Sequence, residues 1–269
     1  SDMGYVAGEK ILDDEYNGFA NSSSNNINAI WGDGNGTKGW GQTNTISTVS
    51  AGATITAAQW NTLQDRLKDV ADHQGSSINN SSGGSLSSGN TIAIISNLAT
   101  DITTVTNNRY NVDSDNLTTT SNPNSVNRTF TSVWDTQVIH EVSFTFASSN
   151  ALRYFMNGGG EITHVWALSG GTEDDKYQEW EDLFETKAAT FTFKAIADSL
   201  SGSGSAGTNL NEGFWSSGLT NGGGYQLPQT MFADTAPYTT NYVQWEAKVT
   251  GTAGSDGGKG EVLTLKATA

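Results

Sequence analysis

Two alternating stretches that flank a short helical pattern, all between Gln137 and Leu168, constrain the fold of this chain most. Apolar side chains occupy every second position over residues 138–146, and a second alternation covers residues 161–168. A period of two is typical of β-strands. Residues 151–156 between them favour a short helix, and the glycines at 158–160 end it because glycine tolerates the left-handed conformation. The stretch predicts two strands joined by a helix at the centre of a sheet core.

The composition favours turn-rich β structure with long polar loops. Of the 269 residues, 31 are glycine and only three are proline, while 35% are hydrophobic. Eight Trp and ten Phe argue against wholesale disorder, because these side chains bury large areas. The net charge of −15 repels phosphate backbones and anionic lipids, so we expect neither nucleic acid nor a membrane as a partner.

The cysteine count excludes several further classes. With no cysteine, the protein has no disulfide, no thiolate catalysis and no cysteine metal site. No apolar run is long enough to span a membrane. The first residues lack the basic and apolar regions of a signal peptide, and we expect Met3 to be the natural start.

Three helical patterns occupy residues 4–110, which we predict to form an N-terminal module. The first spans residues 13–31 and has a weak interior, since residues 21–26 are only Ser and Asn. The second begins at a capping box of Thr56 and Gln59 and carries the most regular apolar stripe of the chain. A third pattern follows residues 75–90, which are almost all Ser, Asn and Gly and predict a flexible linker or long loop.

The apolar positions of the second and third helices suit two interpretations. They are either core positions of a small bundle or, given the heptad spacing in the third helix, a surface for self-association. The candidate assembly residues are Trp60, Leu63, Leu67, Ile95, Leu98, Ile102 and Val105.

The remainder of the chain predicts a second, β-rich domain. Residues 111–126 are polar, contain Pro123 and are assigned as a linker, so the second domain covers residues 127–269. Its further elements are a helix after Asp174, a strand over residues 189–196 and a closing hairpin from strands 238–251 and 261–267. We therefore predict an α+β fold: a small helical module followed by an antiparallel sheet or sandwich with short helices packed on it.

A search for chemistry yields few candidates. Asp33, Asn35 and Thr37 have the spacing of a calcium loop, but Lys38 stands where that loop needs glycine, so we favour a structural turn over Trp40. His140 and His164 lie on the two central strands and approach each other if these strands pair. A metal would need a third ligand, such as Glu141 or Glu161, and no ligand motif supports one. His73 fits a capping or packing role.

We therefore predict no catalytic, cofactor-binding or metal-binding residues and no cofactor. Acidic pairs such as those needed by a glycoside hydrolase arise by chance among 28 acids. Trp215 and Tyr225, in predicted loops, are the candidate aromatics for recognising a surface such as a glycan, although core packing is the more common role of these residue types.

Several segments resemble virion structural proteins of tailed phages that infect marine cyanobacteria and related aquatic bacteria. The first are Tyr16-Asn17, the glycine-rich run ending in Gly39-Trp40-Gly41-Gln42, the helix start Thr56-Ala57-Ala58-Gln59-Trp60-Asn61, and His73-Gln74. In the second half, Val142-Ser143-Phe144-Thr145-Phe146, the run from Ala151 to Ile162, and Trp180 with Leu183 are similar to the same proteins. The matches cover most of residues 9–185 in order, and the last eighty residues resemble the family less.

The resemblance implies a non-enzymatic protein of the virion, in the tail or tail fibre, that acts through assembly. Its partners would be other virion proteins, and it would be made in the host cytoplasm. The heptad spacing and the apolar helical stripe add the expectation of a homo-oligomer, for which we take a trimer. The alternatives are an adhesin module that binds a host receptor or surface glycan and, less favoured, a glycan hydrolase.

Overall fold

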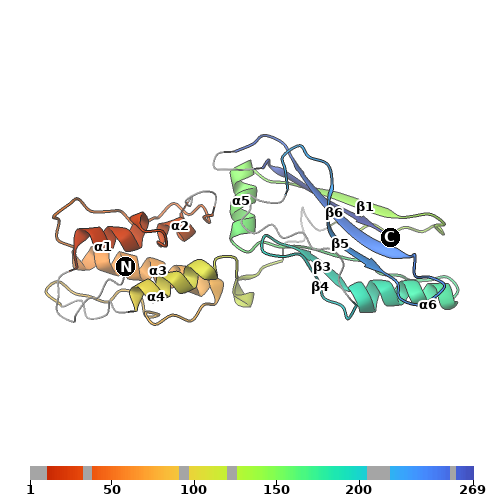
Figure 1. Ribbon diagram of the computed structural model, residues 1–269, viewed down its shortest axis with the longest axis horizontal. Helices are drawn as coiled ribbons and strands as arrows, with labels where there is room; N and C mark the ends of the chain where they lie inside the picture. The colour runs from red at the N-terminus through yellow and green to blue at the C-terminus, as the bar shows by residue number, and fades with distance from the viewer. Residues whose placement is uncertain (1–10, 33–37, 91–96, 120–125, 205–218, 255–258) are drawn as a thin grey trace. The chain divides into compact units, whose positions relative to one another are not determined.

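The computed structural model describes residues 11–32, 38–90, 97–119, 126–204, 219–254 and 259–269. They form two compact units (Figure 1). The first comprises residues up to Thr118 together with Asn157–Gly159, and the second holds the rest. The class is α+β with a β-rich domain, as predicted.

The first unit is a small helical module. Its helices are α1 (Asp13–Asn17), a π-helical turn at Gly18–Ser22, α2 (Asn28–Trp31), α3 (Ala57–Gln74) and α4 (Leu98–Asn107). The predicted first helix is thus broken where Ser and Asn compete with its backbone, and Asn26 caps the restart by accepting from Ala29 N at 2.8 Å. The capping box of α3 is confirmed, since Thr56 Oγ1 accepts from Gln59 N at 3.1 Å and Gln59 Oε1 accepts from Thr56 N at 2.9 Å.

Asparagine side chains hold the long loops of this unit. Asn17 both donates to Val49 O at 2.9 Å and accepts from Val49 N at 2.8 Å. Asn28 bonds Ile46 in the same two-fold way, and Asn61 bonds Leu86. Each amide therefore satisfies one loop residue's N–H and C=O as a β-strand partner would.

The segment predicted as a flexible linker or long loop, residues 75–90, is a loop fastened to the helices. The buried carboxylate of Asp101 accepts four hydrogen bonds of 2.7 to 2.9 Å, from the backbone and side-chain nitrogens of Asn79 and Asn80. Ile78 and Leu86 of the loop pack against the hydrophobic core.

The predicted linker, residues 111–126, is only in part a connection between units. The units divide after Thr118, and the residues before that point are hydrogen-bonded to the first unit. Asp113 N donates to His73 O at 2.8 Å, and a 3₁₀ turn follows at Ser114–Asn116. These backbone contacts, which polarity alone does not reveal, make the start of the predicted linker part of the helical module.

The second unit contains two antiparallel sheets. The strands are β1 (Ile139–Thr145), β2 (Ile162–Val165), β3 (Thr190–Phe193), β4 (Ser199–Leu200), β5 (Gln226–Phe232), β6 (Tyr242–Thr250) and β7 (Val262–Thr268). One sheet has the order β1-β7-β6-β5 and the other β2-β3-β4. The helices are α5 (Ser149–Asn157) and α6 (Asp175–Glu181), which continues as a π-helical segment at Asp182–Ala188.

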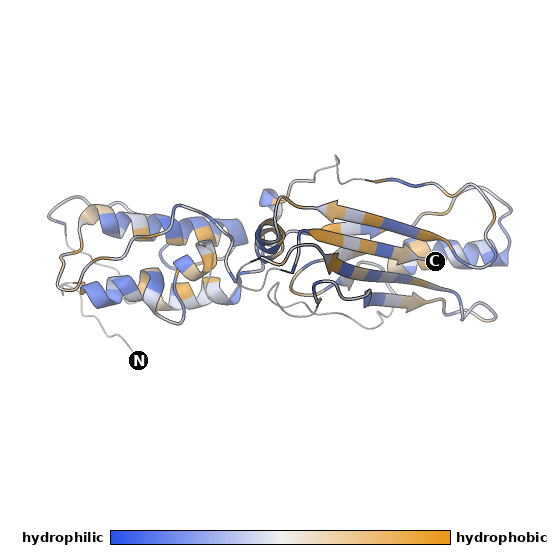
Figure 2. Ribbon diagram, turned by 90° about the horizontal axis from the view of Figure 1, so that it is seen from above, coloured by the Kyte–Doolittle hydropathy of each residue, from blue (hydrophilic) through white to orange (hydrophobic). Residues whose placement is uncertain are grey.

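The two sheets pack face to face. Trp245 of β6 is fully buried and stacks on Phe191 of β3, with ring centroids 5.0 Å apart and an interplanar angle of 11°. Hydrophobic and hydrophilic residues alternate along the strands in Figure 2, as expected when one face of each sheet is buried. The predicted closing hairpin of β6 and β7 is confirmed.

Two features of the sheets differ from the sequence-based expectation. The strands around α5 do not pair with each other: β1 pairs with β7, and β2 pairs with β3. Strand β5 lies in sequence that showed no pattern, because Pro228 and an irregularity in register between Gln226 and Gln229 interrupt its alternation. A proline is tolerated there because β5 is the last strand of its sheet.

Candidate functional site

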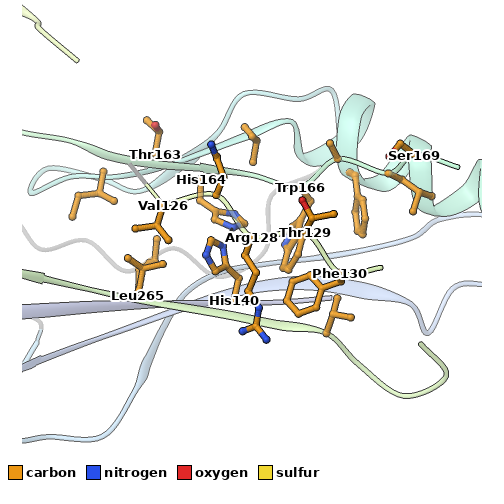
Figure 3. Close-up of a pocket in the computed structure, with 18 of the residues that line it drawn as sticks. Val126, Arg128, Thr129, Phe130, His140, Thr163, His164, Trp166, Ser169 and Leu265 are labelled. Carbon is orange, nitrogen blue, oxygen red and sulfur yellow. Dashed lines mark hydrogen bonds between the residues drawn. The ribbon is translucent and has the colours of Figure 1, made fainter. Parts of the chain in front are cut away.

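The two histidines of the central stretch meet across the two sheets. His140 lies on β1 of the four-stranded sheet and His164 on β2 of the other, and their side chains face each other in the core (Figure 3). His140 Nδ1 is 3.2 Å from His164 Nε2. The expected proximity is therefore present, but it arises from sheet packing and not from strand pairing.

A buried tryptophan fixes the protons of this pair. Trp245 Nε1 donates to His164 Nδ1 at 3.0 Å. An indole nitrogen only donates, so His164 Nδ1 must accept and its proton sits on Nε2. That Nε2–H donates to His140 Nδ1, which leaves the remaining proton of a neutral His140 on its own Nε2. The chain of donors thus runs from Trp245 through His164 to His140.

Both imidazoles are held neutral. Burial, followed by the neighbouring His140, lowers the pKa of His164 to about 4. Burial, followed by the positive charge of Arg128, also lowers the pKa of His140. Each shift favours the uncharged ring that the donor chain requires, because a second proton on either bridging nitrogen would place two N–H groups against each other.

This arrangement is unsuited to holding a metal ion. In the chain of donors, each nitrogen of the pair either accepts a hydrogen bond or carries a proton, so no lone pair is free. Glu141 does not join the pair either. It follows His140 on β1 and points to the opposite face of the sheet, where its carboxylate accepts from the hydroxyl of Tyr225.

A cavity of about 650 Å³ opens beside the histidines. Its walls come from β1, β2 with the residues that follow it, β7, the π-helical segment after α6 and the segment of residues 126–138. They combine aromatic and aliphatic side chains with a few polar ones. Among the described residues, Arg128 is the only one of the lining with a formal charge, and it lies between His140 and Phe130 in Figure 3. The guanidinium carbon of Arg128 is 4.6 Å from the centre of the Phe130 ring.

Two nitrogen donors in this wall have no hydrogen-bond partner among the residues that the structure describes. They are His140 Nε2 and Trp166 Nε1, and both are shielded from water. His140 is only 8% exposed. Trp166 is fixed by its ring contacts with His164 at 5.1 Å and Phe184 at 5.8 Å. Alternation along the strand pointed to Trp166 as a core residue, but no sequence signal indicated that its N–H would be left without an acceptor.

The structure describes one of the two aromatic residues predicted to recognise a surface, Trp215 and Tyr225. Trp215 lies outside the described residues. Tyr225 is half-buried, and the ammonium groups of Lys248 and Lys266 lie 4.6 and 4.1 Å from its ring centre. Its hydroxyl is engaged by Glu141, and burial together with this contact raises its pKa. Tyr225 is therefore part of a polar network on the sheet surface and does not present a free ring for a sugar.

The candidate assembly residues that the structure describes lie in the hydrophobic core of the first unit. Residues Trp60, Leu63, Leu67, Leu98, Ile102 and Val105 are at most 3% exposed, and Ile95 lies outside the described residues. These side chains fill one cluster with apolar residues of α1, the π-helical turn and α2, including Tyr16, Phe19 and Ile30. An assembly contact through them would require the helical unit to open, so the bundle interpretation of the heptad spacing holds within a single chain.

Trp40, near the end of the glycine-rich run, is buried, and its Nε1 donates to Arg109 O at 3.2 Å. His73 packs on it with ring centroids 4.4 Å apart, which fits the predicted packing role. The residues of the rejected calcium loop, Asp33, Asn35 and Thr37, lie outside the described part of the chain.

One acidic grouping stands apart from the histidine cavity. Oxygen atoms of Glu179, Asp182 and Asp234 lie within 4.8 Å of one another. Lys187 already provides a cation there, since its ammonium pairs with Asp234 and, at 3.3 Å, with Asp182.

Comparisons with known proteins found no relative of this chain. The chain matches no protein-family model, and neither curated proteins nor solved structures show a similarity to it. Among the described residues, none of the helices is long and apolar enough to cross a membrane.

Proposed function

We propose that this chain is a non-enzymatic structural protein of a tailed-phage virion, located in the tail or its fibres, that acts by assembling with other virion proteins. The proposal is supported by the hydrogen bonds that the motif residues form. The polar residues through which the chain resembles virion proteins bind backbone groups of the chain itself.

Three of these contacts illustrate the pattern. Asn17 and Asn61 each hold one loop residue by two hydrogen bonds, and Gln74 Nε2 donates to Val105 O at 2.8 Å. A motif whose polar side chains bind the backbone of the same chain fixes the conformation of its loops. A catalytic motif would instead direct such groups toward a cleft. Preserved shape is what an assembly module requires.

Exposed apolar side chains of the second unit supply surfaces for such assembly. Val133 is 98% exposed, Val165 of β2 is 59% exposed and Phe232 of β5 is 56% exposed. Strands β2 and β5 each end a sheet, where backbone groups are open to a further strand. A further chain that paired along β2 or β5 would lie beside the exposed apolar side chain of that strand.

The direct test is detection of this chain in purified particles. Mass spectrometry of density-purified virions from the phage that encodes it should find its peptides in stoichiometric amount, and particle reconstruction should place it in the tail. Its absence from such particles, with the protein present in the infected cell, would reject the proposal.

A solution test addresses assembly separately. Light scattering at high concentration should give a mass above the 28.4 kDa of one chain. Phe232→Lys should lower that mass, whereas Thr239→Lys, at another exposed position, should not. A mass of one chain at every concentration would leave heterologous virion partners as the only route to assembly.

A further inference from the structure

We infer that the cavity beside His140 binds a small carboxylate with an apolar body, such as a medium-chain fatty acid. The inference is independent of the proposed role in a virion. It rests on the unmatched donors in the cavity wall, on the charge of that wall and on its apolar lining.

The first observation is the pair of donors without acceptors. His140 must carry its remaining proton on Nε2, because Trp245 and His164 fix its Nδ1 as an acceptor. Trp166 Nε1 is also an obligatory donor. Leaving each buried N–H unpaired carries a free-energy cost, because the group has lost its hydrogen bonds to water. An acceptor group that enters the cavity would remove this cost at both nitrogens.

The second observation is the sign of the charge. The chain carries a net charge of −15, yet none of the described residues that line the cavity is acidic, and Arg128 is one of them. The acceptor that suits two N–H donors beside a guanidinium is an anion with more than one oxygen. A carboxylate meets that description with a single charge, and the single cation of the lining matches it.

The third observation is the remainder of the wall. Aliphatic and aromatic groups dominate it, among them Val142, Phe144, Leu265 and Phe184. Val126 and Val165 continue the apolar surface and are 47% and 59% exposed. A volume of about 650 Å³ lies within the range of small-molecule pockets. An alkyl chain of about ten carbons would be stabilised there by the removal of its methylene groups from water.

Entry of the headgroup involves Arg128. Both donors are shielded from water, and Arg128 lies next to His140 (Figure 3). Arg128 is exposed and belongs to the segment of residues 126–138, which has no regular secondary structure up to β1. Its side chain can therefore turn outward without disturbing a helix or strand, and its guanidinium then covers the bound carboxylate.

The test is calorimetric titration of the full chain with decanoate, below the concentration at which it forms micelles, and with decanol as an uncharged analogue. Saturable binding of one decanoate per chain is expected, with decanol at least about tenfold weaker, because hydrogen bonds to a charged group contribute about 1.5 to 3 kcal/mol. Trp166→Phe, which keeps the apolar ring, and Arg128→Gln should each weaken decanoate about tenfold. Tyr225→Phe, on the other face of the sheet, should bind as the original chain does.

A second measurement uses the unmodified protein and so does not depend on the variants folding. In histidine labelled with ¹⁵N, the Nε2 resonance of His140 should shift as decanoate is added and saturate with the calorimetric constant. Two results would overturn the inference: no saturable decanoate binding, or binding that Trp166→Phe and Arg128→Gln leave unchanged and that does not move this resonance.

Discussion

Trp245 Nε1 lies 3.0 Å from His164 Nδ1, so a tryptophan of one sheet sets the protonation of a histidine in the other. The same indole stacks on Phe191, the residue that pairs with His164 across β2 and β3. One side chain thus joins the sheets by both apolar contact and a hydrogen bond. Both contacts should affect measurable quantities, namely the stability of the second unit and the pKa of His164.

Acid should weaken the second unit between pH 6.5 and 4. The folded pKa of His164 is about 4 and its ordinary value is 6.5, so the unfolded chain binds the extra proton in this window. Stability from this group is complete above pH 6.5 and falls as the pH drops to 4, by about 3 kcal/mol at most. Urea unfolding at several pH values checks this against His164→Gln, which bonds similarly but does not titrate. Parallel curves for the two proteins would contradict the assignment.

Trp245→Phe should raise the pKa of His164 as well as destabilise the unit. The substitution removes the donor that favours the neutral ring, and it shrinks a fully buried side chain at a cost of about 2 kcal/mol. Histidine titration by NMR and urea unfolding give the two quantities. Trp60→Phe, at a buried site of the first unit, is the matched control and should lower stability without moving this pKa.

Asn17→Ala should destabilise the helical unit by about 1 to 3 kcal/mol, because both the N–H and the C=O of Val49 lose their partner. Asn17→Asp keeps an acceptor for Val49 N but loses the donor to Val49 O. Its stability should therefore lie between those of the original chain and of Asn17→Ala. Thermal unfolding followed by circular dichroism measures the change. The exposed Asn25→Ala serves as control and should stay within about 0.5 kcal/mol of the original chain.

Asp101→Asn should release the loop of residues 75–90. The new amide nitrogen would face two of the four donors of Asn79 and Asn80 that the buried carboxylate now accepts, and only the remaining oxygen would still accept from the other two. Faster hydrogen exchange at the backbone amides of these two residues is expected, with a loss of about 2 kcal/mol or more in stability. Asp72→Asn removes only a surface pair with Lys68 and should change neither quantity appreciably. Unchanged exchange in Asp101→Asn would show that the loop is held by other contacts.

Local patterns predicted much of the fold. The capping box at Thr56 and the stripe through Leu63 and Leu67 located α3, and alternation located β1, β2, β6 and β7. These elements depend on contacts between residues near in sequence or on which face of an element is apolar. Both properties can be read directly from the amino-acid sequence. The run of Ser and Asn predicted only a weak interior in one helix, whereas the structure has a break there between α1 and α2.

Other features depend on partners distant in the chain. The amides of Asn17, Asn28 and Asn61 bind loop residues 18 to 32 positions away, which no local pattern predicts. Strand β5 was missed because Pro228 hides its alternation, and only its place at the end of a sheet makes that proline acceptable. The burial of the heptad-like stripe was likewise decided by which helices surround it.

The sequence alone determined that His140 and His164 point inward from two apolar strands. Tertiary structure decided that those strands belong to different sheets, that the rings meet across the core, and that Trp245 fixes their protons. The reason is physical: alternation specifies the face on which a side chain lies, whereas its hydrogen-bond partner is set by which faces pack together.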